Sequence, residues 1–168
     1  MTLAEINAMD EARFVATLGG IFEHSPWVAQ GAFGDRPFAS VSALHVAMLA
    51  AVDRASEAQK LALLRAHPEL AGKAAVRGEM TRDSVSEQSG AGLSQCSPEE
   101  FARLTELNAR YNARFGFPFI LAVKGYDRAG IIGEFARRVD NDRATEFGEC
   151  LAQIARITRF RLDALVTD

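Results

Sequence analysis

Apolar residues recur along most of the chain at the three- and four-residue spacing of an amphipathic helix. The clearest case lies at residues 41–52, where Leu44, Met48 and Val52 fall on one face. Strict alternation, which would indicate strands, is nearly absent. The pattern predicts an all-α fold, a single compact domain of about seven to eight helices spanning residues 1–168. Besides 41–52, helices are expected at about 12–22, 56–67, 98–111, 127–139 and 142–165, whereas residues 69–93 form the least regular stretch.

Several helix ends carry capping residues. Ser97 precedes Pro98 and is followed three positions later by Glu100, which is the pattern of a capping box with proline in the first turn. Ser40 is expected to cap the helix that follows it, and Asn141 or Asp142 is expected to cap the last helix. Another helix is expected to begin at or near Asp127.

Two stretches interrupt the helical pattern. Residues 24–38 contain two prolines and two glycines, which predicts a loop. Residues 115–123 read Phe-Gly-Phe-Pro-Phe-Ile-Leu-Ala-Val, too short and proline-interrupted for a helix. We expect one short, extended and buried segment there.

Composition narrows the class of protein. With 168 residues, 48% hydrophobic and 24% charged, the chain is large enough to bury a core without a disulfide or metal. A net charge of −3 argues against a nucleic-acid partner, because phosphate binding needs a basic excess. No apolar stretch approaches the roughly 20 residues needed to cross a bilayer. We expect neither a nucleic-acid nor a membrane partner.

The two cysteines, Cys96 and Cys150, form no CxxC or zinc-binding pattern. The first residues lack a basic region followed by an apolar one, so they do not resemble a signal peptide. We expect a reduced, cytoplasmic protein.

His67 is the first candidate for chemistry. Pro68 forces the residue before it out of the helical region, so His67 should lie at a helix C-terminus. The negative end of the helix dipole favours the imidazolium, which suits a proton donor near neutral pH. Alternatively, His67 is only a favourable residue for a helix end.

Ser84, Glu87 and Gln88 stand at i, i+3 and i+4, so on a helix they share one face. Together they could bind a small polar ligand. The alternative is that Ser84 and Glu87 form a capping box and only satisfy free amide groups.

Arg161 lies on or beside the apolar stripe of the last helix, with Ile157 and Leu165. A guanidinium there needs an anionic partner. That partner is either an internal carboxylate or a group of the substrate.

Three blocks in this order resemble the signature of the 2-oxo-4-hydroxy-4-carboxy-5-ureidoimidazoline (OHCU) decarboxylase family. They are the run 67–73 (His-Pro-Glu-Leu-Ala-Gly-Lys), Ser84 with Glu87 and Gln88, and the run 115–120 (Phe-Gly-Phe-Pro-Phe-Ile). The resemblance covers most of the chain. It implies an all-helical fold, no metal or organic cofactor, a small-molecule substrate and a homodimer.

The resemblance also implies roles for individual residues. His67 matches the proton donor and Glu87 the second catalytic residue. Arg161 matches an arginine that reaches the site from the last helix. The remaining matches are to substrate-contacting positions: Pro68, Ser84, Val85, Ser86, Gln88, Phe119, Ile120, Leu121, Ala122 and Val123.

The family's reaction releases CO2 from OHCU, the last step from urate to (S)-allantoin. The electrons left behind can delocalise into the neighbouring C=N bond, so no cofactor is needed as an electron sink. The intermediate is then protonated on one face. Two alternatives stay open: a helical interaction module whose polar cluster only caps helices, and a hydrolase of a related cyclic ureide.

Overall fold

A computed structural model describes the backbone of residues 1–168 and every side chain except those at positions 74 and 76. It consists of ten α-helices and two 3-10 helices. Within these described residues the only β-type pairing is an isolated bridge between Thr2 and Thr167. The prediction of an all-α fold is confirmed.

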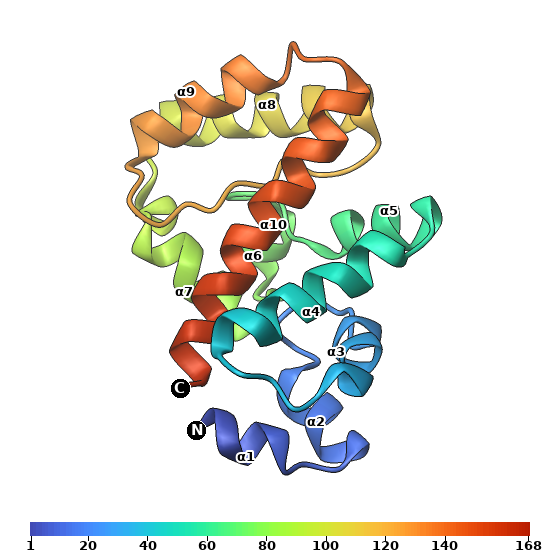
Figure 1. Ribbon diagram of the computed structural model, residues 1–168. Coiled ribbons are helices and arrows are strands. Elements are labelled where there is room, and N and C mark those ends of the chain that lie inside the picture. Colours follow the sequence, from blue (N-terminus) through green and yellow to red (C-terminus); the bar gives the residue numbers. More distant parts are fainter. The chain divides into compact units, whose positions relative to one another are not determined.

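The chain divides into two compact units. The first comprises residues 1–66 and 155–168. Its α3 lies alongside α4 (Figure 1), with Gly31 placed where an added Cβ would be 2.9 Å from the Ala51 Cβ, so a glycine is needed at this contact. The elements of this unit are α1 (Leu3–Asn7), α2 (Glu11–Leu18), α3 (Trp27–Ala32), η1 (Phe33–Asp35), α4 (Val41–Arg54), α5 (Glu57–Ala66) and the last part of α10 (Arg143–Leu165).

The second unit comprises residues 67–154. Its two long helices, α8 and α9, run side by side (Figure 1) and are joined by the segment that contains residues 116–127. The elements are α6 (Lys73–Arg77), α7 (Arg82–Gly90), η2 (Leu93–Gln95), α8 (Pro98–Phe115), α9 (Arg128–Arg138) and the first part of α10.

The predicted starts of three helices are confirmed, and each start carries a side-chain cap. Ser40 accepts from the Ala43 N–H at 3.1 Å, and Asp127 accepts from the Gly130 N–H at 2.7 Å. Ser97 and Glu100 form the full capping box of α8. These polar pairs satisfy amide groups that a helix start leaves without intrahelical partners.

The prediction of a loop throughout 24–38 is wrong. Pro26 precedes the first residue of α3, because a helix start does not need the amide hydrogen that proline lacks. The first long helix is also shorter than expected, since α2 ends at Leu18 before the pair Gly19 and Gly20. The helices outnumber the expectation because α1, α3 and α6 have only five or six residues, too few to show a periodic pattern.

The second unit is built around an ion pair with no solvent exposure. Arg138 Nη2 lies 2.9 Å from Glu146 Oε2, and both side chains are 0% exposed. The Tyr111 hydroxyl donates to the same carboxylate, and Asn141 Nδ2 donates to its other oxygen at 2.9 Å. Arg138 Nη1 donates to the Ile120 carbonyl at 2.8 Å. The pair therefore connects α8, α9, α10 and the buried segment that contains residue 120.

Burial shapes the protonation of this cluster. It raises the pKa of the Cys150 thiol, so Cys150 stays protonated and unreactive. Burial, with Cys150 and Glu146 close by, also raises the pKa of Tyr111 far above its ordinary value.

Gly116 ends α8 in the left-handed region with φ of +76°. A Cβ there costs about 1–2 kcal/mol, so we expect Gly116→Ala to lower the free energy of unfolding by about 1 kcal/mol. The matched control is Gly133→Ala inside α9, where an added Cβ meets nothing within 4 Å. That change should stabilise the protein by roughly 0.5–1 kcal/mol. Urea unfolding followed by circular dichroism measures both, and equal stability of the two variants would contradict the assignment.

Tyr111 should remain protonated in the folded protein well above pH 10. Its folded pKa is raised relative to the unfolded chain, so its contribution to stability is complete below about pH 10 and is lost as the pH rises further. In a Tyr126→Phe variant Tyr111 is the single tyrosine. We expect tyrosinate absorbance at 295 nm to appear only together with loss of the circular-dichroism signal. Tyrosinate formation in a still-folded protein would disprove the buried hydrogen bond.

Candidate active site

His67 directly follows the last residue of α5, as the proline after it predicts. Its side chain is only 6% exposed, whereas Pro68 is half-buried. A buried imidazole is shielded from bulk water, which strengthens its interaction with any reacting group beside it.

The α7 helix presents the predicted polar face. Ser84 and Gln88 are buried and Glu87 is half-buried, whereas Val85 and Ser86 are exposed. The capping alternative for Ser84 is wrong, because the side chain that caps α7 is Thr81, which accepts from the Ser84 N–H at 3.4 Å. This also removes the reason for reading the cluster as helix capping in an interaction module.

Gln88 joins this face to the segment that follows His67. Its Oε1 accepts from the Ala71 N–H at 3.0 Å, and its Nε2 donates to the Glu69 carbonyl at 3.1 Å. Ala71 has φ of +50°, a left-handed conformation that costs about 1–2 kcal/mol in a residue with a Cβ. Gln88 therefore stabilises a strained turn four residues after His67.

Two further amides hold the same segment from α8. Asn108 Nδ2 donates to the Leu70 carbonyl at 2.9 Å, and Asn112 Nδ2 donates to Glu69 Oε1 at 2.5 Å. Neither asparagine is among the predicted site residues. The available signal was a polar residue at position 108 directly after the buried Leu107 of the apolar stripe.

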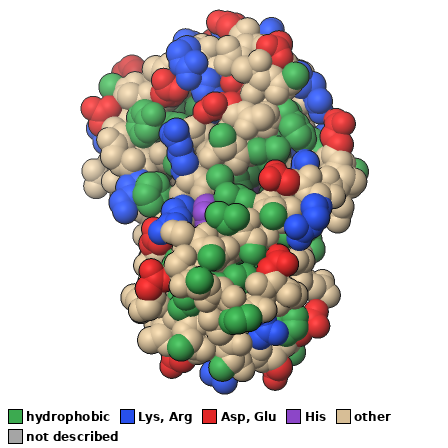
Figure 2. Space-filling model, viewed as in Figure 1, with side chains coloured by type: hydrophobic (Ala, Val, Ile, Leu, Met, Phe, Trp, Pro, Cys, Tyr) green, Lys and Arg blue, Asp and Glu red, His purple; other side chains and the backbone are tan. Residues whose placement is uncertain are grey.

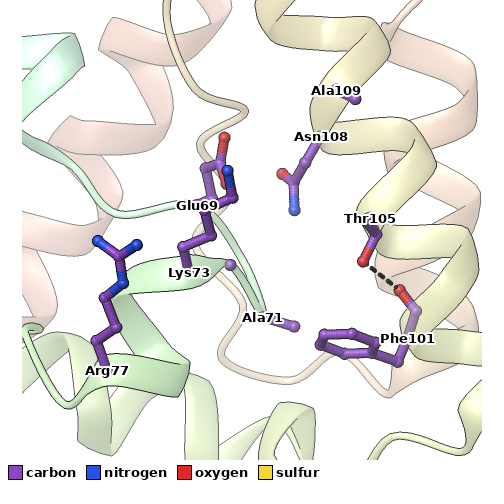
Figure 3. Close-up of a pocket in the computed structure, with 9 residues that line it drawn as sticks. Glu69, Ala71, Lys73, Arg77, Phe101, Thr105, Asn108 and Ala109 are labelled. Atoms are coloured by element: carbon purple, nitrogen blue, oxygen red, sulfur yellow. Dashed lines mark hydrogen bonds between the residues drawn. The ribbon is translucent and has the colours of Figure 1, made fainter.

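A cavity of about 470 Å³ lies against this segment. Figure 3 shows the two walls of this cavity. Neither predicted catalytic residue, His67 or Glu87, lines it. A second cavity of about 670 Å³ is bordered by Val85 and Gln88 together with Met80 and Cys96. The walls of the first cavity include Glu69, Lys73 and Arg77 on one side and Phe101, Thr105 and Asn108 of α8 on the other.

All five residues of the segment 119–123 are buried. The Phe119 ring stacks on Phe135 of α9 with centroids 3.9 Å apart and meets Tyr111 of α8 edge-on at 5.5 Å. The segment after His67 and the segment 119–123 are therefore both fixed to α8. The second unit thus contains every predicted site residue except Arg161.

Arg161 belongs to the first unit, where it forms a buried ion pair. Its Nη1 lies 2.7 Å from Glu23 Oε2, with side chains 4% and 1% exposed, and 3.4 Å from the Ile21 carbonyl oxygen. Of the two partners that the sequence left open, the internal carboxylate is present. Because Glu23 fixes the guanidinium, Arg161 has a defined orientation rather than a free choice of rotamers.

The described residues show neither a metal-binding cluster nor a membrane-spanning helix. Among the residues whose side chains are described, no group of three His, Cys, Asp or Glu could hold a metal ion. None of the helices formed by the described residues is both long and apolar enough to cross a membrane. On the face shown in Figure 2, Arg and Lys alternate with Asp and Glu instead of forming one basic patch.

The chain is similar to several known proteins over nearly its whole length. It is 43% identical to the 2-oxo-4-hydroxy-4-carboxy-5-ureidoimidazoline decarboxylase of Haloferax volcanii, covering 96% of this chain and 94% of that protein. It is 39% identical to a human protein named as a putative enzyme of the same kind, covering 99% and 96%. It is 42% identical to the uric acid degradation bifunctional protein PucL of Bacillus subtilis, of which it spans only 33%.

Solved structures agree with these relatives. A crystal structure of (S)-allantoin synthase superposes with a TM-score of 0.81 at 30% identity, covering 99% of this chain and 54% of that one. A crystal structure of OHCU decarboxylase in the presence of (S)-allantoin superposes with a TM-score of 0.69 at 22% identity, covering 94% and 98%, and supports the fold. Residues 7–163 match the family described as OHCU decarboxylase, and with the relatives above this shows that the chain belongs to the OHCU decarboxylase family.

Proposed function

We propose that this chain decarboxylates OHCU and protonates the intermediate on one face, giving (S)-allantoin and CO2. The observation that carries this proposal is the link between α7 and the segment after His67. Gln88 hydrogen-bonds that segment at two points, while Ser84 and Glu87 lie on the same helical face as Gln88. A buried histidine and a carboxylate are thereby held on adjoining elements, as proton transfer in a confined site requires.

His67 delivers the proton and Glu87 assists it. An imidazole can donate or accept a proton in the pH range where enzymes work, and a carboxylate can orient it or accept the substrate's hydroxyl proton. Pro68, Ser84, Val85, Ser86 and Gln88 border the substrate on this side. No cofactor takes part, because the C=N bond of the substrate accepts the electrons that CO2 leaves behind.

Arg161 binds an oxygen of the substrate, and the segment 119–123 contacts the ring. A guanidinium stabilises a carboxylate or a developing oxyanion strongly where water is excluded. The Glu23 ion pair supports this role by orienting the guanidinium.

The 168 residues act as one decarboxylase domain, supported by the family match over residues 7–163. We place the protein in the cytoplasm as a homodimer that takes a small-molecule substrate and no nucleic acid or membrane. The free thiols of Cys96 and Cys150 fit a reducing compartment.

Replacing His67 by Asn should lower kcat by about 10²–10⁴-fold and leave binding of (S)-allantoin detectable, because the change removes a proton donor but little binding surface. The assay generates OHCU from urate with urate oxidase and hydroxyisourate hydrolase and follows the optical activity of allantoin. The matched control is His24→Asn, since His24 is exposed and has φ of +46°, a conformation that asparagine tolerates. Retained activity in His67→Asn would exclude His67 as the proton donor. Racemic allantoin at the spontaneous rate from folded wild-type protein would overturn the whole proposal.

Variants of the Glu23–Arg161 pair distinguish a structural role of Arg161 from a role in substrate binding. Glu23→Gln leaves a buried guanidinium without its counter-charge and should cost about 2–4 kcal/mol of unfolding free energy. Adding Arg161→Met to that variant should recover part of this stability, because no unpaired charge remains. It should not recover activity, because the group that binds the substrate oxygen is lost. Wild-type kcat/KM in the double variant would assign Arg161 a structural role alone.

A further inference from the structure

The cavity of about 470 Å³ between α6 and α8 contains groups that the proposed reaction does not use. Its volume falls within the range of about 300–1,000 Å³ that is usual for small-molecule sites. Neither His67 nor Glu87 lines it. The Phe101 ring of α8 is 43% exposed and borders the cavity together with Ala71 and Ala109. The cavity can therefore bind the apolar part of a small molecule.

Two cations border the same cavity from α6. Lys73 and Arg77 stand at i and i+4, so their side chains share one face of a five-residue helix. Like charges at this spacing repel each other and destabilise a helix. In the part of the chain whose side chains are described, neither residue forms a hydrogen bond or an ion pair. An anion bound by both side chains would remove this repulsion.

The single carboxylate of the lining does not balance these two cations. Glu69 Oε1 already accepts from Asn112 Nδ2 of α8 at 2.5 Å. The charged residues that line the cavity are Glu69, Lys73 and Arg77, which together carry one net positive charge. A carboxylate ligand would neutralise that charge, whereas a phosphate monoester carries nearly two negative charges.

The α8 wall carries a hydrogen-bond acceptor that lacks a donor. Asn108 is 5% exposed, and its carboxamide extends from α8 toward the segment that contains Glu69 and Ala71 (Figure 3). Its Nδ2 donates to the Leu70 carbonyl, but its buried Oδ1 accepts no hydrogen bond from any described residue. Buried acceptors are almost always hydrogen-bonded in native proteins. Because the last torsion of an asparagine has a broad energy minimum, a small turn of the carboxamide presents Oδ1 to an N–H in the cavity.

We propose that this cavity is a second small-molecule site, which takes a small carboxylate whose apolar body carries an amide N–H. The carboxylate binds Lys73 and Arg77, the apolar body packs on Phe101, and the N–H donates to Asn108 Oδ1. An amide N–H suits the site better than an ammonium group, because Lys73 and Arg77 would repel a further cation. Binding at this site does not depend on the proposed decarboxylation.

N-acetyl-phenylalanine has all three features and serves as the probe. We expect it to bind the whole chain with a Kd on the order of 1 mM, as the size of the molecule allows. In ¹⁵N-labelled protein it should shift the backbone amide resonances of Ala71, Thr105 and Ala109, which line the cavity, and the shifts should saturate. The absence of saturable shifts at these three residues would overturn the proposal.

Two derivatives of the probe each lack one of its features. N-acetyl-phenylalaninamide has no negative charge, and O-acetyl-phenyllactate has an ester oxygen where the probe has its N–H. Each should bind about tenfold more weakly, the ester because it leaves Asn108 Oδ1 without a donor. An ester that binds as tightly as the probe would exclude the hydrogen bond to Asn108. A carboxamide that binds as tightly would exclude the contact with the cations, and either result would overturn the proposal.

Variants of α6 test the charge contact. Lys73→Gln and Arg77→Gln should each raise the Kd of the probe about threefold, because exposed ion pairs contribute modestly, and the double variant about tenfold. The matched control is Arg103→Gln, which changes the net charge equally. Arg103 lies on α8 outside the lining of the cavity and pairs with Glu106 at the surface. We expect its Kd to equal that of the wild type. An equal rise in this control would show general electrostatic attraction and overturn the site.

Competition with (S)-allantoin distinguishes a second site from the substrate site. Because neither His67 nor Glu87 lines the cavity, the probe should still bind when (S)-allantoin is saturating. A Kd of the probe that rises in direct proportion to the concentration of (S)-allantoin would show competition and overturn the second site. A wild-type protein that forms no (S)-allantoin would overturn only the proposed function, since these binding measurements require no activity.

Discussion

The buried pair of Arg138 and Glu146 is the interaction on which the second unit depends. Removing two charges from water is costly, and their attraction repays that cost only when the remaining hydrogen-bonding atoms are also satisfied. Here Tyr111 and Asn141 complete the carboxylate, and the Ile120 carbonyl accepts one of the guanidinium hydrogens. The pair thus joins three helices to a segment that has no secondary structure. A neutral, well-packed core would give comparable stability, but it would not fix the direction of a backbone carbonyl.

The α8 helix contacts both the segment that contains Phe119 and the segment after His67. Tyr111 points to the ion pair and to Phe119, while Asn108 and Asn112 point to the segment after His67. These three residues lie one, three or four positions apart, which is about one turn of helix. One turn of α8 therefore sets the distance between the two segments. A shift of α8 would therefore move the proposed proton donor and the proposed ring contact together, which keeps their mutual geometry constant.

The sequence predicted what local chemistry determines and missed what tertiary contacts determine. The cap Ser97, the helix start at Asp127 and the helix end before Pro68 follow from neighbouring residues, and all were predicted. Ser84 was open to a capping reading because Ser-x-x-Glu fits that pattern, yet Thr81 starts the helix three residues earlier. Gln153 could not be singled out, since its partner, the Ala122 N–H, belongs to a residue 31 positions away. The role of a side-chain amide depends on which backbone group it hydrogen-bonds, and the spacing of residues in the sequence does not predict that partner.

The residues that hold the site differ in charge from those that would act in it. Gln88, Asn108 and Gln153 hold backbone groups with neutral amides, and the one charged anchor, Arg138, is neutralised by Glu146. The side chains that contact these backbone groups therefore carry no net charge once Arg138 is paired with Glu146. Electrostatic influence falls off slowly in a buried environment, so an uncompensated charge in any anchor would alter proton transfer as well as position. A cofactor-free decarboxylase depends on a few groups for its chemistry. Because the anchors are neutral, the protonation of those groups is determined by the substrate and by their interactions with one another.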